Sequence, residues 1–170
     1  GGMSIEHAWY GREFRLLRLA VHDPASYAKE AFPQLWEPCY KVGFVRNPWD
    51  WWVSAFFWYD FCKHYTSFRE FVLDHENALK QFPLRCQWPM VCDTDGRLLV
   101  DFVGRFERLE SDYTAICNQV GVVPVPLPHR HETKHCLYWR YYNAETVEIV
   151  RKISARDCEL FGYEFPEHGL

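Results

Sequence analysis

Apolar residues recur at helical spacing in three stretches of the chain, which predicts three amphipathic helices. The first covers residues 4–19, and its apolar positions are Ile5, Ala8, Trp9, Leu16 and Leu19. The second ends at Gly121, and its apolar positions are Leu109, Tyr113, Ile116, Cys117 and Val120. The third runs from Asn143 to about Leu160 and is expected to bury Val147, Val150 and Ile153.

Prolines, capping residues and turn residues mark where shorter elements begin. Asp23-Pro24 predicts an N-cap followed by Pro in the first helical position, with a helix continuing to about Phe32. Ser67 predicts the cap of a helix over residues 68–73. Asp93-Thr94-Asp95-Gly96 predicts the turn of a hairpin between strands over residues 87–92 and 97–106.

An apolar run over residues 40–45 predicts a buried strand that passes directly into a helix. Asn47 is the expected N-cap of that helix and Pro48 its first residue, and the helix should continue to about Phe61. Helices that alternate with a few strands favour an α/β domain with a mostly parallel sheet. Because no repeat or linker divides the chain, we expect a single domain over residues 1–170.

Composition narrows the classes of protein that the chain can represent. Of its 170 residues, 48% are hydrophobic and 18% aromatic, which excludes general disorder. The net charge of -4 excludes a nucleic-acid coat or a polybasic membrane binder, so an anionic ligand needs a local basic site. No apolar run approaches the roughly 18 residues that span a bilayer. The seven cysteines form no CxxC pair, which predicts reduced thiols in a cytoplasmic protein.

Arg46 carries the most informative chemistry, because it stands between the predicted strand and the helix that follows. Its planar guanidinium is suited to bidentate phosphate binding beside the free N–H groups and positive dipole end of that helix. Ser54 follows about two helical turns later and has a hydroxyl for the same anion. The alternative is a structural arginine that pairs with Asp50.

An unusual number of aromatic residues follows Arg46, namely Trp49, Trp51, Trp52, Phe56, Phe57, Trp58 and Tyr59. Most of them must belong to the core, since aromatic side chains dominate buried area. The helix is too aromatic for one buried stripe, so one or two rings are expected to face an acceptor or a partner.

The sequence Gly1-Gly2-Met3-Ser4 leads into the first predicted helix, as the tail of a phosphate-binding loop would. Glycines allow the backbone to approach a phosphate closely, and Ser4 has a hydroxyl to offer. Two glycines before a methionine are also what a cleaved expression tag leaves behind.

Several blocks of sequence, taken in order, resemble a known family. They are Gly1–Glu6, Phe44–Asp50 with Val53–Ala55, Val103–Glu110 with Asp112, and Asp157–Phe165. Together they resemble the sulfotransferases that use 3′-phosphoadenosine 5′-phosphosulfate (PAPS), in particular the carbohydrate sulfotransferases and their short bacterial relatives. The Gly1–Glu6 block is similar to the end of the family's 5′-phosphosulfate loop, and the Phe44–Asp50 block is similar to its 3′-phosphate motif.

The resemblance implies a P-loop-like parallel sheet flanked by helices, and transfer of a sulfuryl group from PAPS to a carbohydrate or other small-molecule acceptor. It implies that Arg46 and Ser54 bind the 3′-phosphate of PAPS or of its product, adenosine 3′,5′-bisphosphate (PAP). The backbone of Gly1, Gly2 and Met3, with Ser4, would bind the 5′ side. No metal, nucleic acid or membrane is implied.

A general base for the acceptor proton is expected between the two phosphate motifs, as in the family. His22 is the leading candidate, with His7 and Glu6 as rivals. The alternative for His22 is a loop histidine that caps the next helix. The basic segment 129–135 matches a region that closes over cofactor or acceptor in the family, with Arg130 and Lys134 as its best anion ligands; a solvated basic face is the alternative.

The chain departs from the family at its start. The family's phosphate loop begins with a strand and a Pro-Lys pair, and the Lys would fall two positions before Gly1. We therefore expect a fold without the first strand and the start of the phosphate loop, and an exposed sheet edge that favours a homo-oligomer. The alternative function is a catalytically impaired PAPS- or PAP-binding or interaction module. A phosphoryl transferase is disfavoured, because the chain has no Gly-x-x-x-x-Gly-Lys-Ser/Thr motif.

Overall fold

The computed structural model describes residues 23–58, 63–80, 86–127 and 136–167. These residues pack as two compact units. The first unit takes its described residues from 1–45 and 88–131, and the second from 46–87 and 132–170. The fold is α/β, as expected, with a two-stranded parallel sheet and helices.

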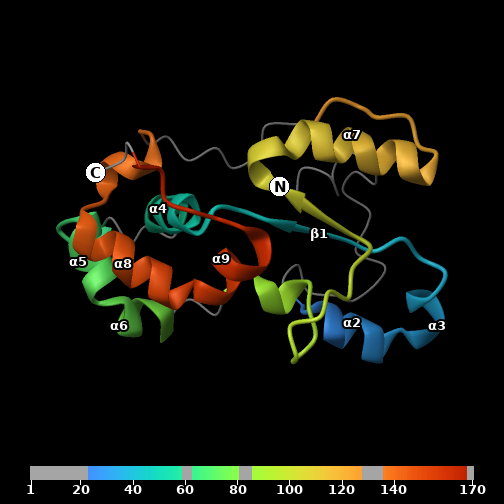
Figure 1. The fold of residues 1–170 in the computed structure, drawn as a ribbon, viewed down its shortest axis with the longest axis horizontal. Coiled ribbons are helices and arrows are strands. Elements are labelled where there is room, and N and C mark those ends of the chain that lie inside the picture. Colours follow the sequence, from blue (N-terminus) through green and yellow to red (C-terminus); the bar gives the residue numbers. More distant parts are fainter. Residues whose placement is uncertain (1–22, 59–62, 81–85, 128–135, 168–170) are drawn as a thin grey trace. The chain divides into compact units, whose positions relative to one another are not determined.

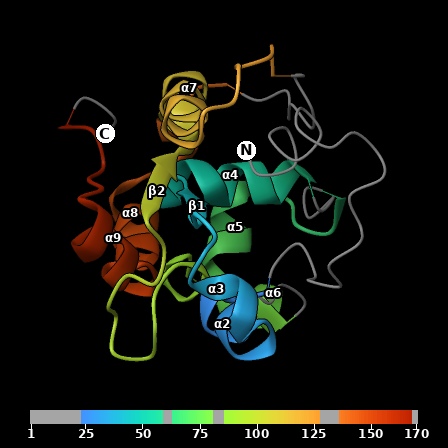
Figure 2. The same cartoon turned by 90° about the vertical axis from the view of Figure 1, so that its right-hand side faces the viewer.

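The sheet of the first unit consists of β1 (Val42–Val45) and β2 (Phe102–Arg105). The strands are parallel, with Val42 opposite Phe102 and Val45 opposite Arg105. Figures 1 and 2 show α7 (Leu109–Val120) beside β2. Phe44 packs against the buried Tyr113 and Cys117 of α7. A side chain at Gly104 would collide with the ring of Phe44, so a glycine is required there.

The amino ends of the two strands are tied together by Lys41 and Asp101. The backbone N–H of Lys41 donates to Oδ2 of Asp101 at 2.8 Å, and its ammonium lies 2.9 Å from the same oxygen. The ammonium also donates to the carbonyl of Trp36 at 3.2 Å and to that of Cys39 at 2.9 Å. One lysine therefore joins the start of the sheet to the helical segment before it.

That segment contains the helix predicted to end at about Phe32, and a second short helix that the sequence did not predict follows it. α2 (Ala25–Ala31) and α3 (Pro33–Trp36) are separated by Phe32, whose φ of -134° and ψ of 54° are not helical. A residue before proline is disfavoured in helical conformation, which explains the break at Phe32. The predicted start was wrong by one residue: Pro24, and not Asp23, is the N-cap of α2, and its carbonyl accepts from the N–H of Ala28.

The predicted hairpin is wrong except at its turn. Gly96 has φ 83°, and Asp93 and Arg97 are bonded across the turn, but Cys92 and Leu98 form a single antiparallel bridge. Residues 88–90 form the 3-10 helix η2. Pro89 has no N–H for a strand ladder, and the second predicted strand, shortened to β2, pairs with β1 instead.

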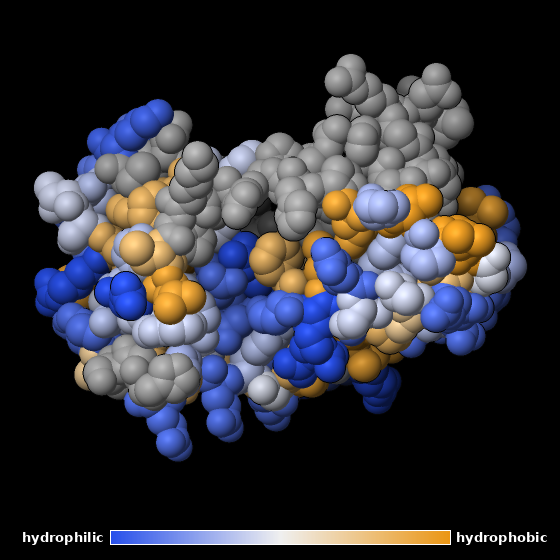
Figure 3. Space-filling view, turned by 90° about the horizontal axis from the view of Figure 1, so that it is seen from above, coloured by the Kyte–Doolittle hydropathy of each residue, from blue (hydrophilic) through white to orange (hydrophobic). Residues whose placement is uncertain are grey.

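α7 matches its prediction closely. Tyr113, Ile116 and Cys117 are buried, and Gly121 ends the helix with φ 72° while the N–H of Val122 bonds to the carbonyl of Cys117. Val120 is exposed, contrary to the predicted stripe. The surface over α7 and the segment after it is partly apolar (Figure 3), and its exposed members are Val120, Val122, Val123 and Val125.

The second unit is helical, and its elements are α4 (Pro48–Trp58), α5 (Phe68–Leu73), α6 (His75–Lys80), η4 (Tyr138–Tyr141), α8 (Ala144–Ile153) and α9 (Ala155–Phe161). α4, α5 and α8 pack on one another around buried Trp52, Phe56, Phe71 and Val150 (Figure 1). The Ser67 cap of α5 is confirmed by a 3.2 Å bond from the N–H of Glu70.

The last predicted helix is interrupted. Ser154 separates α8 from α9, and Gly162 ends α9 with φ 63°. Val147 and Val150 are buried as expected, whereas Ile153 is only half-buried. α6 was not predicted from the sequence.

Candidate anion-binding site at the start of α4

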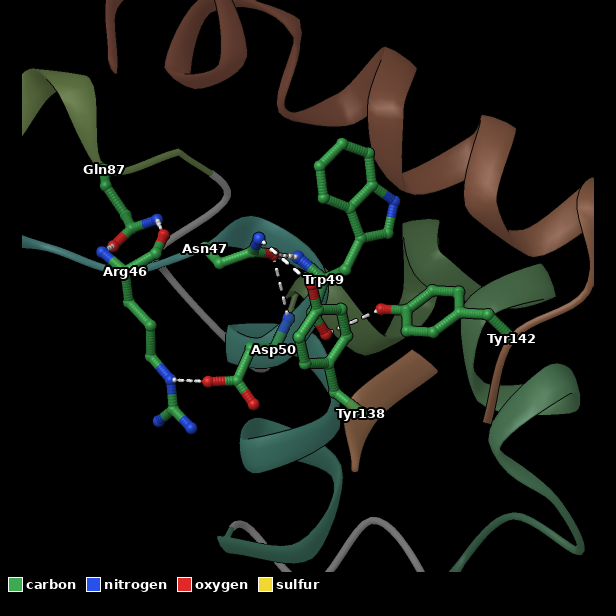
Figure 4. Close-up of polar contacts among 7 residues, drawn as sticks. All are labelled: Arg46, Asn47, Trp49, Asp50, Gln87, Tyr138 and Tyr142. Atoms are coloured by element: carbon green, nitrogen blue, oxygen red, sulfur yellow. Dashed lines mark hydrogen bonds and ion pairs between the residues drawn. The ribbon is translucent and has the colours of Figure 1, made fainter. Parts of the chain in front are cut away.

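The backbone of Arg46 is held by the side chain of Gln87 (Figure 4). β1 ends at Val45, and the N–H of Arg46 then donates to Oε1 of Gln87 at 2.8 Å. In return, Nε2 of Gln87 donates to the carbonyl of Arg46 at 2.7 Å. A primary amide has one donor face and one acceptor face, so it satisfies both peptide groups of one residue.

Gln87 is fixed in turn by Asp157 of α9. The backbone N–H of Gln87 donates to both carboxylate oxygens of Asp157, at 3.0 and 2.9 Å. Asp157 is only 1% exposed. Because a buried carboxylate is costly without hydrogen bonds, these two bonds stabilise Asp157 in its buried position. The same bonds hold the backbone of Gln87 in place.

The side chain of Arg46 forms an ion pair with Asp50, as the structural alternative predicted. Nε of Arg46 lies 2.7 Å from Oδ2 of Asp50, and the two side chains are 18% and 17% exposed. In Figure 4 the terminal guanidinium nitrogens point away from Asp50. The pair therefore engages the Nε side of the guanidinium.

The N-terminus of α4 does not offer the free N–H groups that the sequence led us to expect. Asn47 is the N-cap as predicted: its Oδ1 accepts from the N–H of Trp49 at 3.0 Å and of Asp50 at 3.4 Å. Trp51 donates to the carbonyl of Asn47, and Pro48 has no N–H. The first turn is thus satisfied within the chain, so an anion there would depend on side chains.

Two tyrosines, the buried Tyr142 and the partly buried Tyr138, also bond to this turn. Tyr142 donates its hydroxyl to the carbonyl of Trp49 at 2.9 Å, and Asn47 donates to the hydroxyl of Tyr138 at 3.3 Å. Burial, and then the nearby charge of Asp50, raise the pKa of Tyr142 well above its usual value. Tyr142 therefore stays protonated and remains a donor across the ordinary pH range.

Ser54 shares the helix with Asp50 and lies one turn beyond it. It is half-buried. Because Arg46, Asp50 and Ser54 follow one another at intervals of four, the carboxylate stands between the two predicted phosphate ligands along this face. Arg46 is in contact with Asp50.

The prediction that most of these aromatic residues belong to the core is met by three of the six that α4 contains, while Trp51 and Phe57 are only partly buried. Trp49, Trp52 and Phe56 are buried, while Trp58 is 47% exposed. The interpretation of an exposed ring as an acceptor or partner contact stays a prediction.

The other predicted site residues lie outside the described residues. They are Gly1, Gly2, Met3, Ser4, Glu6, His7, His22, Arg130 and Lys134. Their predicted roles at the 5′ side, as general base and in the basic loop stay predictions.

Sequence reasoning missed Gln87 and gave Asp157 no role. Gln87 stood in a predicted strand, and no local pattern points an amide at Arg46. Asp157 belonged to one of the blocks that resemble the family, but its partner lies 70 residues away along the chain. Only the folded chain brings these residues together.

No family model, curated protein or solved structure matches this chain. Within the described ranges, no cluster of His, Cys, Asp and Glu could hold a metal ion. The helices among those residues are all too short or too polar to cross a bilayer. Six of the cysteines lie in the described segments, and all six are free thiols.

Proposed function

We propose that this chain is a P-loop-like sulfotransferase that binds PAPS or PAP through Arg46 and transfers the sulfuryl group to a hydroxyl acceptor, with a carbohydrate as the favoured class. The proposal starts from the sequence blocks given above. The observation that supports it is an arginine held at both its peptide and its Nε, directly between a parallel strand and a helix.

The guanidinium of Arg46 matches a phosphate in geometry, but the net charge of the pair that it forms with Asp50 does not favour an anion. Asp50 neutralises Arg46 locally, so the attraction for a dianion is weaker than that of an unpaired arginine. The terminal edge of the guanidinium carries its N–H donors in a planar fork, which matches two phosphate oxygens. Ser54, on the same helical face, has a hydroxyl that would add a further donor.

When bound, PAPS supplies an activated sulfuryl group. The residues of this chain would then position the reactants and stabilise charge, and His22 would take the proton of the acceptor hydroxyl. Arg46 and Ser54 would hold the 3′-phosphate, and Gly1, Gly2, Met3 and Ser4 would hold the 5′ side. Arg130 and Lys134 would be the anion ligands of a loop that closes over cofactor or acceptor.

A second candidate is a PAP-binding module without turnover. It is favoured by the satisfied N–H groups of α4 and by the carboxylate of Asp50, because both reduce the stabilisation available to a transferring group. Binding of PAP without sulfation of any offered acceptor would distinguish this module from an enzyme.

The test is calorimetric titration of the full chain with PAP. We expect micromolar binding that Arg46→Ala weakens by about 10- to 100-fold, the usual range for a charge-assisted hydrogen bond. Arg108→Ala is the matched control, because Arg108 also precedes a helix and pairs with an aspartate four residues later. A folded chain that does not bind PAP, or equal losses in both variants, would contradict the proposal.

A further inference from the structure

Gln87 is bonded to Arg46 in a way that holds the two peptide groups on either side of this residue. Its two bonds, 2.8 and 2.7 Å long, lie at the short end of the range for N–H···O bonds. One bond would hold only the peptide group before or after Arg46. Two antiparallel bonds from a planar amide hold both, and so fix the backbone of this residue in position and orientation.

The segment that carries Gln87 is attached at two adjacent residues. Gln87 donates its N–H to Asp157, and Sγ of Cys86 donates to the carbonyl of Ile153 at 3.3 Å. Asp157 lies in the first turn of α9, where a negative charge is favoured by the helix dipole. The position of Gln87 is therefore determined by the end of α8 and the start of α9.

We infer that Gln87, held by Asp157, is a positioning residue for Arg46 and sets the preference of this site for a nucleotide 3′-phosphate. The inference rests on the proposed function. Arg46 is restrained at its peptide by Gln87 and at Nε by Asp50, so little freedom of its side chain is left to lose on binding. Preorganisation of this kind raises affinity without adding a contact to the ligand.

The experiment compares two ligands that differ only in the 3′-phosphate, PAP and adenosine 5′-monophosphate. Gln87→Met keeps the length of the side chain and removes both amide bonds to Arg46. We expect it to lower the affinity for PAP about tenfold, while the affinity for the monophosphate changes less than about twofold. In the Arg46→Ala background, Gln87→Met should have no further effect on PAP, because it acts through Arg46.

A variant of similar structural cost separates positioning from stability. Thr146→Val removes the buried hydroxyl of the α8 capping box, which accepts from the N–H of Asn143, in the same unit and without touching Arg46. It should lower Tm yet leave the ratio of the two affinities unchanged. If Gln87→Met does not fold, Asp157→Asn is measured instead, since it keeps the volume and one acceptor for the N–H of Gln87.

The outcomes distinguish this inference from the proposed function. A wild-type chain that prefers PAP, together with a Gln87→Met variant that keeps the wild-type ratio, overturns the inference alone. If Gln87→Met lowers the affinity for PAP equally in the wild-type and the Arg46→Ala backgrounds, the inference is overturned as well. A folded wild-type chain with no preference for PAP overturns the proposed function and the inference together.

Discussion

Two strand-to-helix junctions carry the same short pattern and use it differently. Arg46 precedes α4 and pairs with Asp50, and Arg108 precedes α7 and pairs with Asp112, each at a spacing of four residues. At α4 the pair is 2.7 Å long, and both side chains are mostly buried. At α7 it is 3.7 Å long, and the side chain of Arg108 is 61% exposed.

The difference lies in what each carboxylate holds. Oδ2 of Asp112 accepts the backbone N–H of Arg105 at 2.7 Å, and a 3-10 turn over residues 106–108 separates β2 from α7. At α4 the backbone of Arg46 is held by Gln87, which leaves Asp50 to hold the side chain. An arginine and an aspartate at this spacing therefore do not define a binding site by themselves. The aspartate is left to hold the arginine side chain only where another group accepts the backbone N–H at the end of the strand.

The largest effect expected within this comparison is at Asp112. Asp112→Ala leaves the N–H of Arg105 without its carboxylate, so the free energy of unfolding should fall by about 2–3 kcal/mol. Arg108→Ala should change it by less than about 0.5 kcal/mol, because exposed ion pairs contribute little. Urea denaturation of both variants checks this asymmetry, and equal losses would contradict it.

A smaller effect on the free energy of unfolding is expected from substitutions at the N-caps of α4 and α7. Asn47→Ala removes the acceptor for the N–H groups of Trp49 and Asp50 and should cost about 1–2 kcal/mol. At α7 the N-cap Arg108 makes no capping bond with its side chain, so Arg108→Ser should gain about 0.5 kcal/mol. Thermal denaturation at fixed pH measures both; a stabilised Asn47→Ala variant would show that the cap of α4 is not needed.

The smallest effect on the free energy of unfolding is expected at the amino ends of β1 and β2. Hydrogen bonds from the backbone and then the side chain of Lys41 lower the pKa of Asp101. A carboxyl with a lowered pKa stabilises the fold above its unfolded pKa of about 3.9, and this stabilisation disappears as pH falls through the folded value.

The corresponding measurement is urea denaturation of the wild type and Asp101→Asn from neutral pH down to acid. The wild type should be the more stable protein at neutral pH, and the difference should shrink below about pH 4. A difference that is the same at both ends of the range would show that the charge of Asp101 does not stabilise the sheet.

The parts of the fold that sequence predicted well depend on neighbours along the chain. The caps at Asn47 and Ser67, the end of α7 at Gly121 and the pair of Arg46 with Asp50 all involve residues within about one or two turns. Their geometry follows from spacing alone, which is why a pattern was sufficient.

The parts that sequence missed depend on distant partners or lack a local signal. β2 pairs with β1 across 60 residues and not with the neighbouring segment 87–92. The break at Ser154 occurs without proline or glycine, in a residue that is itself buried. Gln87 meets partners 41 and 70 residues away, so the part of the site that fixes Arg46 could not be predicted.

The amide of Gln87 has a consequence for solubility as well. A strand from another molecule extends a sheet by pairing with peptide groups that are open at its edge, and such pairing is a common start of aggregation. At Arg46 the side chain of Gln87 takes up both the N–H and the carbonyl. The same two bonds that orient this arginine therefore close its N–H and its carbonyl to an incoming strand.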